Sequence, residues 1–127
     1  MVKPKIYIAS SPKNREVNEE IARILESHEF EVYLPQRDTP QYAGLEVVFE
    51  SNTRAIREAD LIVAVLIDYE CDLGFELGYA YALGKPIIAF ARDKKYLKDK
   101  MIAGSLSKVT FSIRELTSEV KNRLRSS

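Results

Sequence analysis

The sequence has few of the residues that form disulfides or metal sites. It contains one cysteine, Cys71, one histidine, His28, and no tryptophan. A lone cysteine excludes an internal disulfide, and together with a lone histidine it provides too few soft ligands for a zinc site. We therefore expect neither a bound metal nor another cofactor.

Charge of either sign in excess is also lacking, as are long apolar runs. Nineteen Lys and Arg residues balance nineteen Asp and Glu residues, so no overall positive field attracts nucleic acid or an anionic membrane surface. The chain starts MVKPKIYIAS, without the long apolar stretch of a signal peptide, and no run approaches the ~18 to 20 apolar residues of a membrane span. We expect a cytoplasmic protein with no nucleic acid or membrane partner.

Apolar runs rich in β-branched residues alternate with segments of helical period along the 127 residues. This pattern predicts an α/β fold with a doubly wound, five-stranded parallel sheet and helices on both faces. The length and the 46% hydrophobic content suit a single domain over residues 1–127. The predicted strands are Lys5–Ala9, Glu31–Leu34, Leu61–Ile67, Pro86–Ala91 and Lys108–Phe111.

The central strand and one long loop suggest where a ligand binds. The run LIVAVLI is nearly all apolar, as a strand in the middle of a parallel sheet should be. In the flavodoxin-like or Rossmann-like order 2-1-3-4-5, the first and third strands are neighbours whose chains leave in opposite directions, which opens a crevice. The loops Ser10–Asn14 and Asp68–Gly74 should border it, and Pro35–Gly44, with two prolines and a glycine, is expected to be a long loop.

The segment DYECDLGFELGYA places four carboxylates around a predicted helix start. Glu76 falls in or near the first turn, on the side of the crevice. A carboxylate there can attack or stabilise an oxocarbenium-like sugar, because positive charge develops at the anomeric carbon when a glycosidic bond breaks. The alternative is that Glu76 is an N-terminal helix acid stabilised by the helix dipole.

Several of these motifs, in this order, resemble those of one enzyme family. The runs ADLIVAVLI and GFELGYA resemble the central strand and Glu-Leu-Gly signature of nucleoside 2-deoxyribosyltransferases and of the related 2'-deoxynucleoside 5'-phosphate N-hydrolases. The start KIYIASS and the segment KMIAG are similar to further family segments. The resemblance implies that Glu76 attacks the anomeric carbon to form a glycosyl-enzyme intermediate, and that the hydroxyl of Tyr7 holds this glutamate.

The resemblance gives conflicting indications about the 5' end of the substrate. Ser10, Ser11 and Lys13 lie in the loop after the first strand, where they could hold a 5'-phosphate as in the hydrolases. Glu70 lies where the transferases tend to carry an acid for the sugar hydroxyls and the hydrolases a serine, and a carboxylate repels phosphate. The loop can also be an ordinary helix cap and turn, and Glu70 a solvated surface residue.

Three more positions match the family with differences. Asn52 stands where the family generally has an aspartate, so it cannot protonate the leaving base as a carboxylic acid could. Gln41 matches a glutamine that reads the base, although a solvated loop residue explains it as well. Asp99 matches a residue that reaches a neighbouring subunit's site, which implies a homodimer or higher homo-oligomer with shared active sites; alone, it would pass for a charged helix surface.

Two functions from different classes fit these residues. The first is an enzyme that cleaves the N-glycosidic bond of a small-molecule nucleoside or nucleotide and passes the sugar to another base or to water. The second is a non-catalytic nucleotide-binding module that retains the fold, a hypothesis that Asn52 strengthens. A flavodoxin-like electron carrier or phospho-receiver is disfavoured, because the first loop lacks a phosphate-rich flavin signature and no acidic pair ends the first strand.

Overall fold

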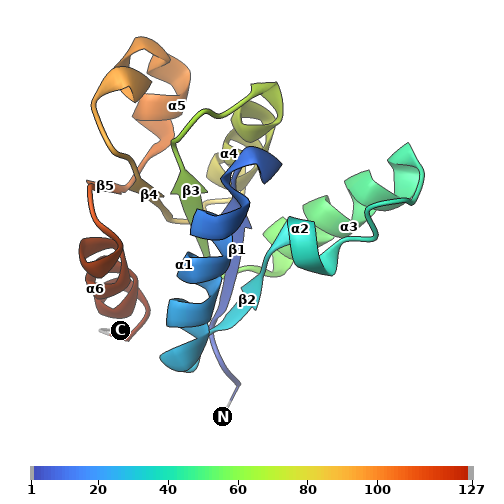
Figure 1. Ribbon diagram of the computed structural model, residues 1–127, viewed down its shortest axis with the longest axis horizontal. Helices are drawn as coiled ribbons and strands as arrows, with labels where there is room; N and C mark the ends of the chain where they lie inside the picture. Colours follow the sequence, from blue (N-terminus) through green and yellow to red (C-terminus); the bar gives the residue numbers. More distant parts are fainter. Residues whose placement is uncertain (1, 126–127) are drawn as a thin grey trace.

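The computed structural model describes residues 2–125 and contains a five-stranded sheet in which every pair of neighbours is parallel (Figure 1). The strands are β1 (Lys5–Ala9), β2 (Glu31–Tyr33), β3 (Leu61–Val65), β4 (Ile87–Phe90) and β5 (Lys108–Thr110). Their order is β2-β1-β3-β4-β5. The predicted α/β class and strand order are confirmed.

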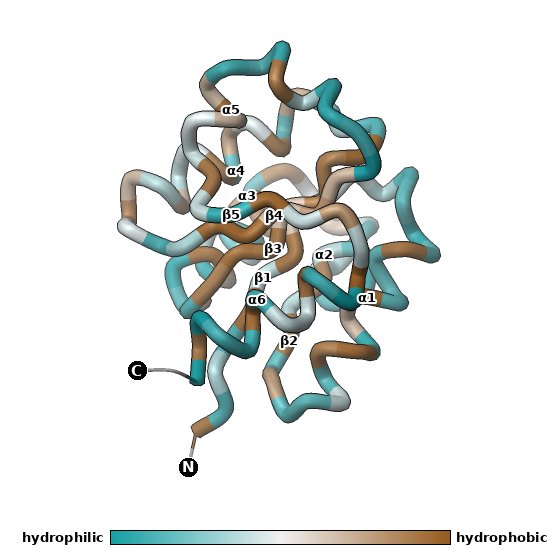
Figure 2. Tube along the Cα trace, turned by 90° about the vertical axis from the view of Figure 1, so that its left-hand side faces the viewer, coloured by the Kyte–Doolittle hydropathy of each residue, from teal (hydrophilic) through white to brown (hydrophobic). Residues whose placement is uncertain are grey.

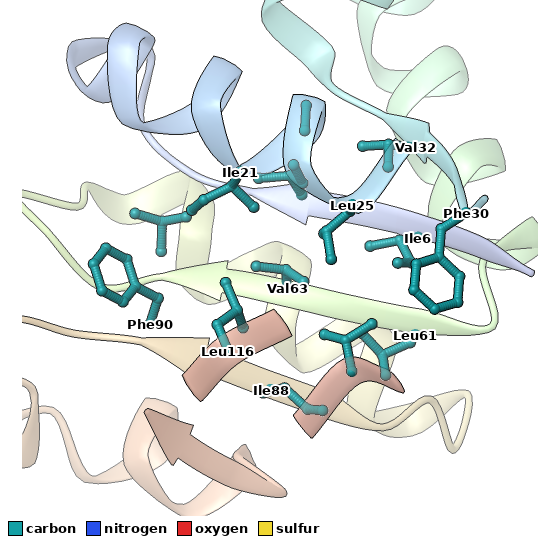
Figure 3. Close-up of a cluster of buried hydrophobic side chains, with 14 of the residues drawn as sticks. Ile6, Ile21, Leu25, Phe30, Val32, Leu61, Val63, Ile88, Phe90 and Leu116 are labelled. Carbon is teal, nitrogen blue, oxygen red and sulfur yellow. The ribbon is translucent and has the colours of Figure 1, made fainter. Parts of the chain in front are cut away.

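Helices cover both faces of the sheet (Figure 1). They are α1 (Arg15–Ser27), α2 (Pro35–Asp38), α3 (Leu45–Glu58), α4 (Cys71–Ala82), α5 (Lys100–Ser105) and α6 (Ile113–Arg125), with short 3-10 turns η1 (Pro12–Asn14) and η2 (Lys95–Lys98). The buried side chains of α1 and α6 pack in one apolar cluster, which Figure 3 shows against β1, β3 and β4. Those of α3 and α4 pack in a second cluster on the other face.

Strand β3 lies in the middle of the sheet because both of its faces are apolar. All five of its residues, LIVAV, are buried. Val63 points into the cluster under α1 and α6, whereas Ile62 and Ala64 belong to the cluster under α3 and α4. The strands accordingly form the hydrophobic centre of the molecule, with hydrophilic residues around it (Figure 2). Such a strand fits only between two covered faces.

The structure corrects several bounds of the prediction. The second and fifth strands are one residue shorter than predicted, and the fourth is two residues shorter. The predicted third strand, Leu61–Ile67, ends at Val65, because the chain turns out of the sheet towards Asp68, which has a positive φ of 44°. The predicted loop Pro35–Gly44 is helical over Pro35–Asp38. Pro35 suits a first helical position, and the carboxylate of Asp38 accepts the Leu34 N–H at 2.9 Å, which closes the turn.

Within residues 2–125, no helix is both long and apolar enough to cross a membrane. Over the same residues, no three His, Cys, Asp or Glu side chains are grouped as metal ligands would be.

Candidate active site

A cavity of about 250 Å³ lies at the carboxyl ends of the strands. Its walls come from the segments that follow β1, β2 and β3, because parallel strands bring their carboxyl ends to one edge of the sheet. It brings together six of the nine site residues expected from the sequence. These are Ser10, Ser11, Gln41, Asn52, Glu70 and Glu76.

Glu76 is held at this cavity by Tyr7. The Tyr7 hydroxyl donates a hydrogen bond to Glu76 Oε2 at 2.9 Å. Tyr7 is fully buried in β1, and its ring stacks on that of Tyr33 with centroids 5.8 Å apart. Helix α4 begins at Cys71, so Glu76 lies in the second turn, where the field of the helix N-terminus has largely fallen off. The position of Glu76 is therefore set by Tyr7 and the core.

The surroundings of Glu76 favour its protonated form. Burial raises the pKa of Glu76 to about 7; the hydrogen bond from Tyr7 opposes this rise, and the negative charge of Asp72 adds to it. Burial and the nearby Glu76 carboxylate also raise the pKa of Tyr7. Tyr7 is therefore a neutral donor at physiological pH, and Glu76 titrates near neutrality, as is common for catalytic carboxylates.

Ser11, Lys13 and Glu70 form a small polar group at one side of the cavity. The Ser11 hydroxyl donates to Glu70 Oε1 at 3.4 Å, and Lys13 Nζ lies 3.7 Å from Glu70 Oε2. The side chains of Lys13 and Glu70 are both more than half exposed, so this ion pair is screened by solvent and contributes little to stability. Its consequence is local: the Glu70 carboxylate occupies the side-chain donors of this loop, the Ser11 hydroxyl and the Lys13 ammonium group.

Asn52 ends a chain of hydroxyl groups that starts in the core. Tyr33 and Thr39 share a hydrogen bond at 2.7 Å, and Thr39 Oγ1 donates to Asn52 Oδ1 at 2.6 Å. The Tyr33 hydroxyl must then be the donor to Thr39. Oδ1 already accepts this bond, so Nδ2, which is a donor only, is the group of Asn52 that remains for a ligand.

Gln41 lines the cavity, but both of its known hydrogen bonds hold the loop. Its Nε2 donates to the carbonyl oxygens of Pro35 at 2.8 Å and of Thr39 at 2.9 Å. The side-chain oxygen Oε1 is the group that remains for a ligand. As an acceptor, it can read a donor on a base edge.

Sequence reasoning missed Asn18 and Thr39, which also line the cavity. Asn18 is 2% exposed and lies on the buried stripe of α1 with Ile21 and Leu25. An asparagine at a core position was a usable signal, because buried polar groups require partners. Thr39, in the loop after α2, gave no such signal, since its partners Tyr33 and Asn52 come from other elements.

Asp99 lies away from Glu76 within the chain. It lines a separate cavity of about 620 Å³ beside η2 and α5, where its carboxylate accepts a hydrogen bond from the Tyr69 hydroxyl. Burial, together with Asp99, raises the pKa of Tyr69 to about 12. The two cavities meet at Glu70, which lines both, but Asp99 itself does not line the cavity that contains Glu76.

A second, apolar cavity of about 320 Å³ adjoins the first. The two cavities share four residues, Val48, Asn52, Asp72 and Glu76. The remaining walls of the second cavity are apolar apart from Thr53, and include Leu45, Phe49 and Phe75. Glu76 thus stands where a polar cavity meets an apolar, aromatic one.

Comparisons with known proteins identify relatives of this chain. A 5-hydroxymethyl-dUMP N-hydrolase from Mus musculus is 29% identical over 98 residues, which are 76% of this chain and 57% of the hydrolase. The chain thus spans little more than half the length of that relative.

Two solved structures share the fold. A 2-deoxyribosyltransferase from Bacillus psychrosaccharolyticus superposes with a TM-score of 0.76 at 24% identity, over 89% of this chain and 90% of that one. A 2-deoxyribosyltransferase from Leishmania mexicana gives a TM-score of 0.63 at 25% identity, over 76% of this chain and 70% of that one. The model of the nucleoside 2-deoxyribosyltransferase family matches residues 6–124. The chain belongs to the nucleoside 2-deoxyribosyltransferase family.

Proposed function

We propose that the protein cleaves the N-glycosidic bond of nucleosides or their 5'-monophosphates, with Glu76 as the nucleophile. The supporting observation is that a carboxylate with a raised pKa, held by a buried tyrosine hydroxyl, stands between a polar and an apolar cavity. A nucleoside has the same two parts, a polar sugar and a flat aromatic base, joined by the bond to be broken.

In the proposed complex, the substrate is divided between the two cavities. The sugar lies among Ser10, Ser11 and Glu70 in the polar cavity, and the base lies against Phe49 and Phe75 in the apolar one. Aromatic side chains bind a base by stacking and by burial of apolar area. In this arrangement the anomeric carbon lies at the boundary, next to Glu76.

The reaction then follows a double displacement. Tyr7 holds Oε2 of Glu76, which leaves Oε1 to attack the anomeric carbon. The new C–O bond forms as the C–N bond breaks, and the leaving base takes the electron pair and a proton from solvent. A second base, or water, next attacks the anomeric carbon and releases the glutamate, so configuration is retained. Asn52 Nδ2 assists by donating a hydrogen bond to the leaving base.

Glu76→Gln tests the nucleophile. We expect kcat to fall by a factor of about 10³ or more, with fold and ligand binding kept, because glutamine has the same shape without the charge. Free base is measured by chromatography, and binding by calorimetry. Glu58→Gln, at the amino-terminal edge of the sheet, is the matched control.

Activity of Glu76→Gln close to that of the parent would reject this role of Glu76. A parent protein that binds nucleosides or nucleotides and turns none of them over would instead support the non-catalytic module.

Transfer and hydrolysis share the first step and differ in the acceptor. Incubating a deoxynucleoside with and without a second base separates them. A new nucleoside that appears only when the second base is present identifies a transferase, whereas free sugar identifies a hydrolase. The tendency to admit water depends on how the apolar cavity is closed.

We also propose that the protein works as a homo-oligomer with shared active sites. Four large apolar residues are well exposed beside the site and on α5: Leu45 (83%), Phe49 (53%), Phe75 (53%) and Met101 (89%). Apolar groups gathered near a site favour association with another surface. Asp99 and Met101 flank the start of α5, the segment that the family resemblance assigns to a neighbouring site.

A further inference from the structure

Two stacked tyrosines direct their hydroxyl groups to different sides of the site. Tyr7 and Tyr33 are register partners on β1 and β2, and their rings stack with centroids 5.8 Å apart. The Tyr7 hydroxyl donates to the carboxylate of Glu76. The Tyr33 hydroxyl is bonded to Thr39, whose Oγ1 donates in turn to Asn52 Oδ1. One tyrosine thus holds the proposed nucleophile, and the other holds the amide of Asn52 through Thr39.

Thr39 is held in place on both sides of its backbone. Its N–H donates to the Pro35 carbonyl oxygen at 3.0 Å, and its own carbonyl oxygen accepts from Gln41 Nε2 at 2.9 Å. The residue is only 4% exposed, so little water competes for its hydroxyl. This hydroxyl lies 2.7 Å from the Tyr33 hydroxyl and 2.6 Å from Asn52 Oδ1. The fold therefore fixes the threonine independently of any ligand.

The direction of these hydrogen bonds decides which end of the Asn52 amide is left over. A threonine hydroxyl has one proton, and the proton of Thr39 goes to Asn52 Oδ1, so Tyr33 donates its own proton to Thr39. A phenol is a better donor than an aliphatic alcohol, which favours this direction. Turning the amide round would require both bonds to reverse. Among residues 2–125, Asn52 Nδ2 donates to no other group.

Asn52 lies where the base would leave in the proposed complex. Together with Glu76, it lines both the polar and the apolar cavity. When the C–N bond breaks, the base takes the electron pair and becomes negatively charged. An amide N–H stabilises this charge by donating a hydrogen bond while keeping its proton, whereas an amide oxygen turned towards the base would repel it. The base takes up a proton from solvent afterwards.

We propose that Thr39 is a positioning residue that fixes the amide of Asn52 as a hydrogen-bond donor to the leaving base, and that the site favours bases able to leave as anions. The proposal deepens the proposed function and rests on it. Such a base carries an acceptor beside its glycosidic nitrogen, as O2 of a pyrimidine or N3 of a purine. It must also bear the negative charge until solvent protonates it.

Thr39→Val tests this role with two substrates of similar shape, 2'-deoxyuridine and 5-fluoro-2'-deoxyuridine. Valine lacks the hydroxyl, so the Asn52 amide is free to turn. We expect the single-turnover rate of base release from 2'-deoxyuridine to fall by about tenfold or more. The rate for the fluorinated substrate should fall by a smaller factor, because fluorine withdraws electrons and makes the base a better leaving group. The ratio of the two rates, measured by chromatography, should therefore rise.

An enzyme that cleaves only purine nucleosides is tested with 2'-deoxyguanosine and 7-methyl-2'-deoxyguanosine. The methylated base carries a positive charge in the substrate and leaves as a neutral molecule, so it depends less on a donor. The same rise in the ratio of rates is expected in Thr39→Val.

Two matched variants separate positioning from a structural defect, which would lower both rates by the same factor. Thr39→Ser keeps the hydroxyl and should restore most of the lost rate. Thr117→Val removes another buried threonine hydroxyl, which bonds the Ile113 carbonyl oxygen within α6, and should leave both rates unchanged. Circular dichroism checks that each variant is folded.

Asn52→Ala removes the donor itself at a half-buried position, and it tests the same step if Thr39→Val does not fold. It should raise the ratio of rates in the same way. Adding Thr39→Val to it should lower neither rate further, because Thr39 acts only through Asn52.

The outcomes distinguish this proposal from the proposed function. An active parent with an unchanged ratio of rates in Thr39→Val, or in Asn52→Ala, would reject the proposal and keep the enzyme. A further loss of rate in the double variant, equal to the loss that Thr39→Val causes alone, would also reject it. A parent that releases no base from any nucleoside or nucleotide would reject both.

Discussion

The pKa of Glu76 decides the pH range in which the proposed reaction can run. Only the deprotonated carboxylate is a nucleophile, and burial raises the pKa of Glu76 to about 7. We therefore expect kcat/KM to rise about tenfold per pH unit below pH 7 and to level off above it. Initial rates between pH 5 and 9 measure this dependence of kcat/KM on pH. A flat profile across this range would contradict the nucleophile assignment.

Tyr7 sets the pH at which this rise in kcat/KM occurs. Its hydrogen bond lowers the pKa of Glu76 against the effect of burial, so Tyr7→Phe should move the midpoint to higher pH and reduce kcat/KM near pH 6 by about tenfold. The ring and its stack on Tyr33 are kept. Tyr33→Phe is the matched control, because it removes a hydroxyl that bonds Thr39 and not Glu76. Equal midpoints in all three proteins would show that Tyr7 does not tune the carboxylate.

At the scale of elements, α4 carries Glu76 and ends in a defined cap. Gly84 has a φ of 75°. Its N–H donates to the Tyr81 carbonyl oxygen, and the Lys85 N–H donates to that of Ala80, both at 3.0 Å. These two bonds form a Schellman motif, in which the residue after the cap adopts a left-handed conformation that glycine allows without a steric cost.

Substitutions of Gly84 should therefore destabilise the protein in a set order. We expect Gly84→Ala to lower the free energy of unfolding by about 1 kcal/mol. Gly84→Val should cost more, because the side chain is β-branched, and Gly84→Asn less, because asparagine tolerates this conformation. Urea unfolding followed by circular dichroism measures the series. An alanine variant as stable as the parent would mean that the cap is not required.

The sequence predicted the elements better than their ends. Apolar runs such as LIVAV identify buried strands because burial on both faces leaves no room for polar residues. The end of β3 was placed too late because Leu66 and Ile67 are apolar although the chain has already left the sheet. The helix Pro35–Asp38 was missed because its one proline and three polar residues are typical of a loop. The hydrogen bond from the Leu34 N–H to Asp38, which closes the turn, can be seen only in the folded conformation.

The same limit applies to the site. The sequence indicated the crevice and most of its lining, because strand order determines which loops meet. It could not give the chain of hydroxyls from Tyr33 through Thr39 to Asn52, whose members come from three segments. Nor could it show that Glu70 occupies the donors of Ser11 and Lys13. Such pairings can be identified only from the distances between side chains in the folded structure.

At the scale of the whole molecule, the apolar cavity is open in a single chain. Leu45, Phe49 and Phe75 line it and are each more than half exposed, and the amino-terminal half of α3 extends away from the sheet (Figure 1). Water that reaches a glycosyl intermediate hydrolyses it, so transfer to another base requires a cover. A second subunit can provide this cover, which links assembly to the choice between transfer and hydrolysis.

Mixing two inactive variants tests whether the active site is shared. Glu76→Gln removes the nucleophile, and Asp99→Ala removes the group proposed to reach the partner's site. Alone, each should be weakly active. If subunits exchange at random between dimers, half of the dimers contain one subunit of each variant. Each such heterodimer has one intact site out of two, so activity should recover to about one quarter of the parent's. Sedimentation velocity should show at least dimers. No recovery after subunit exchange, or an active monomer, would show that each chain carries a complete site.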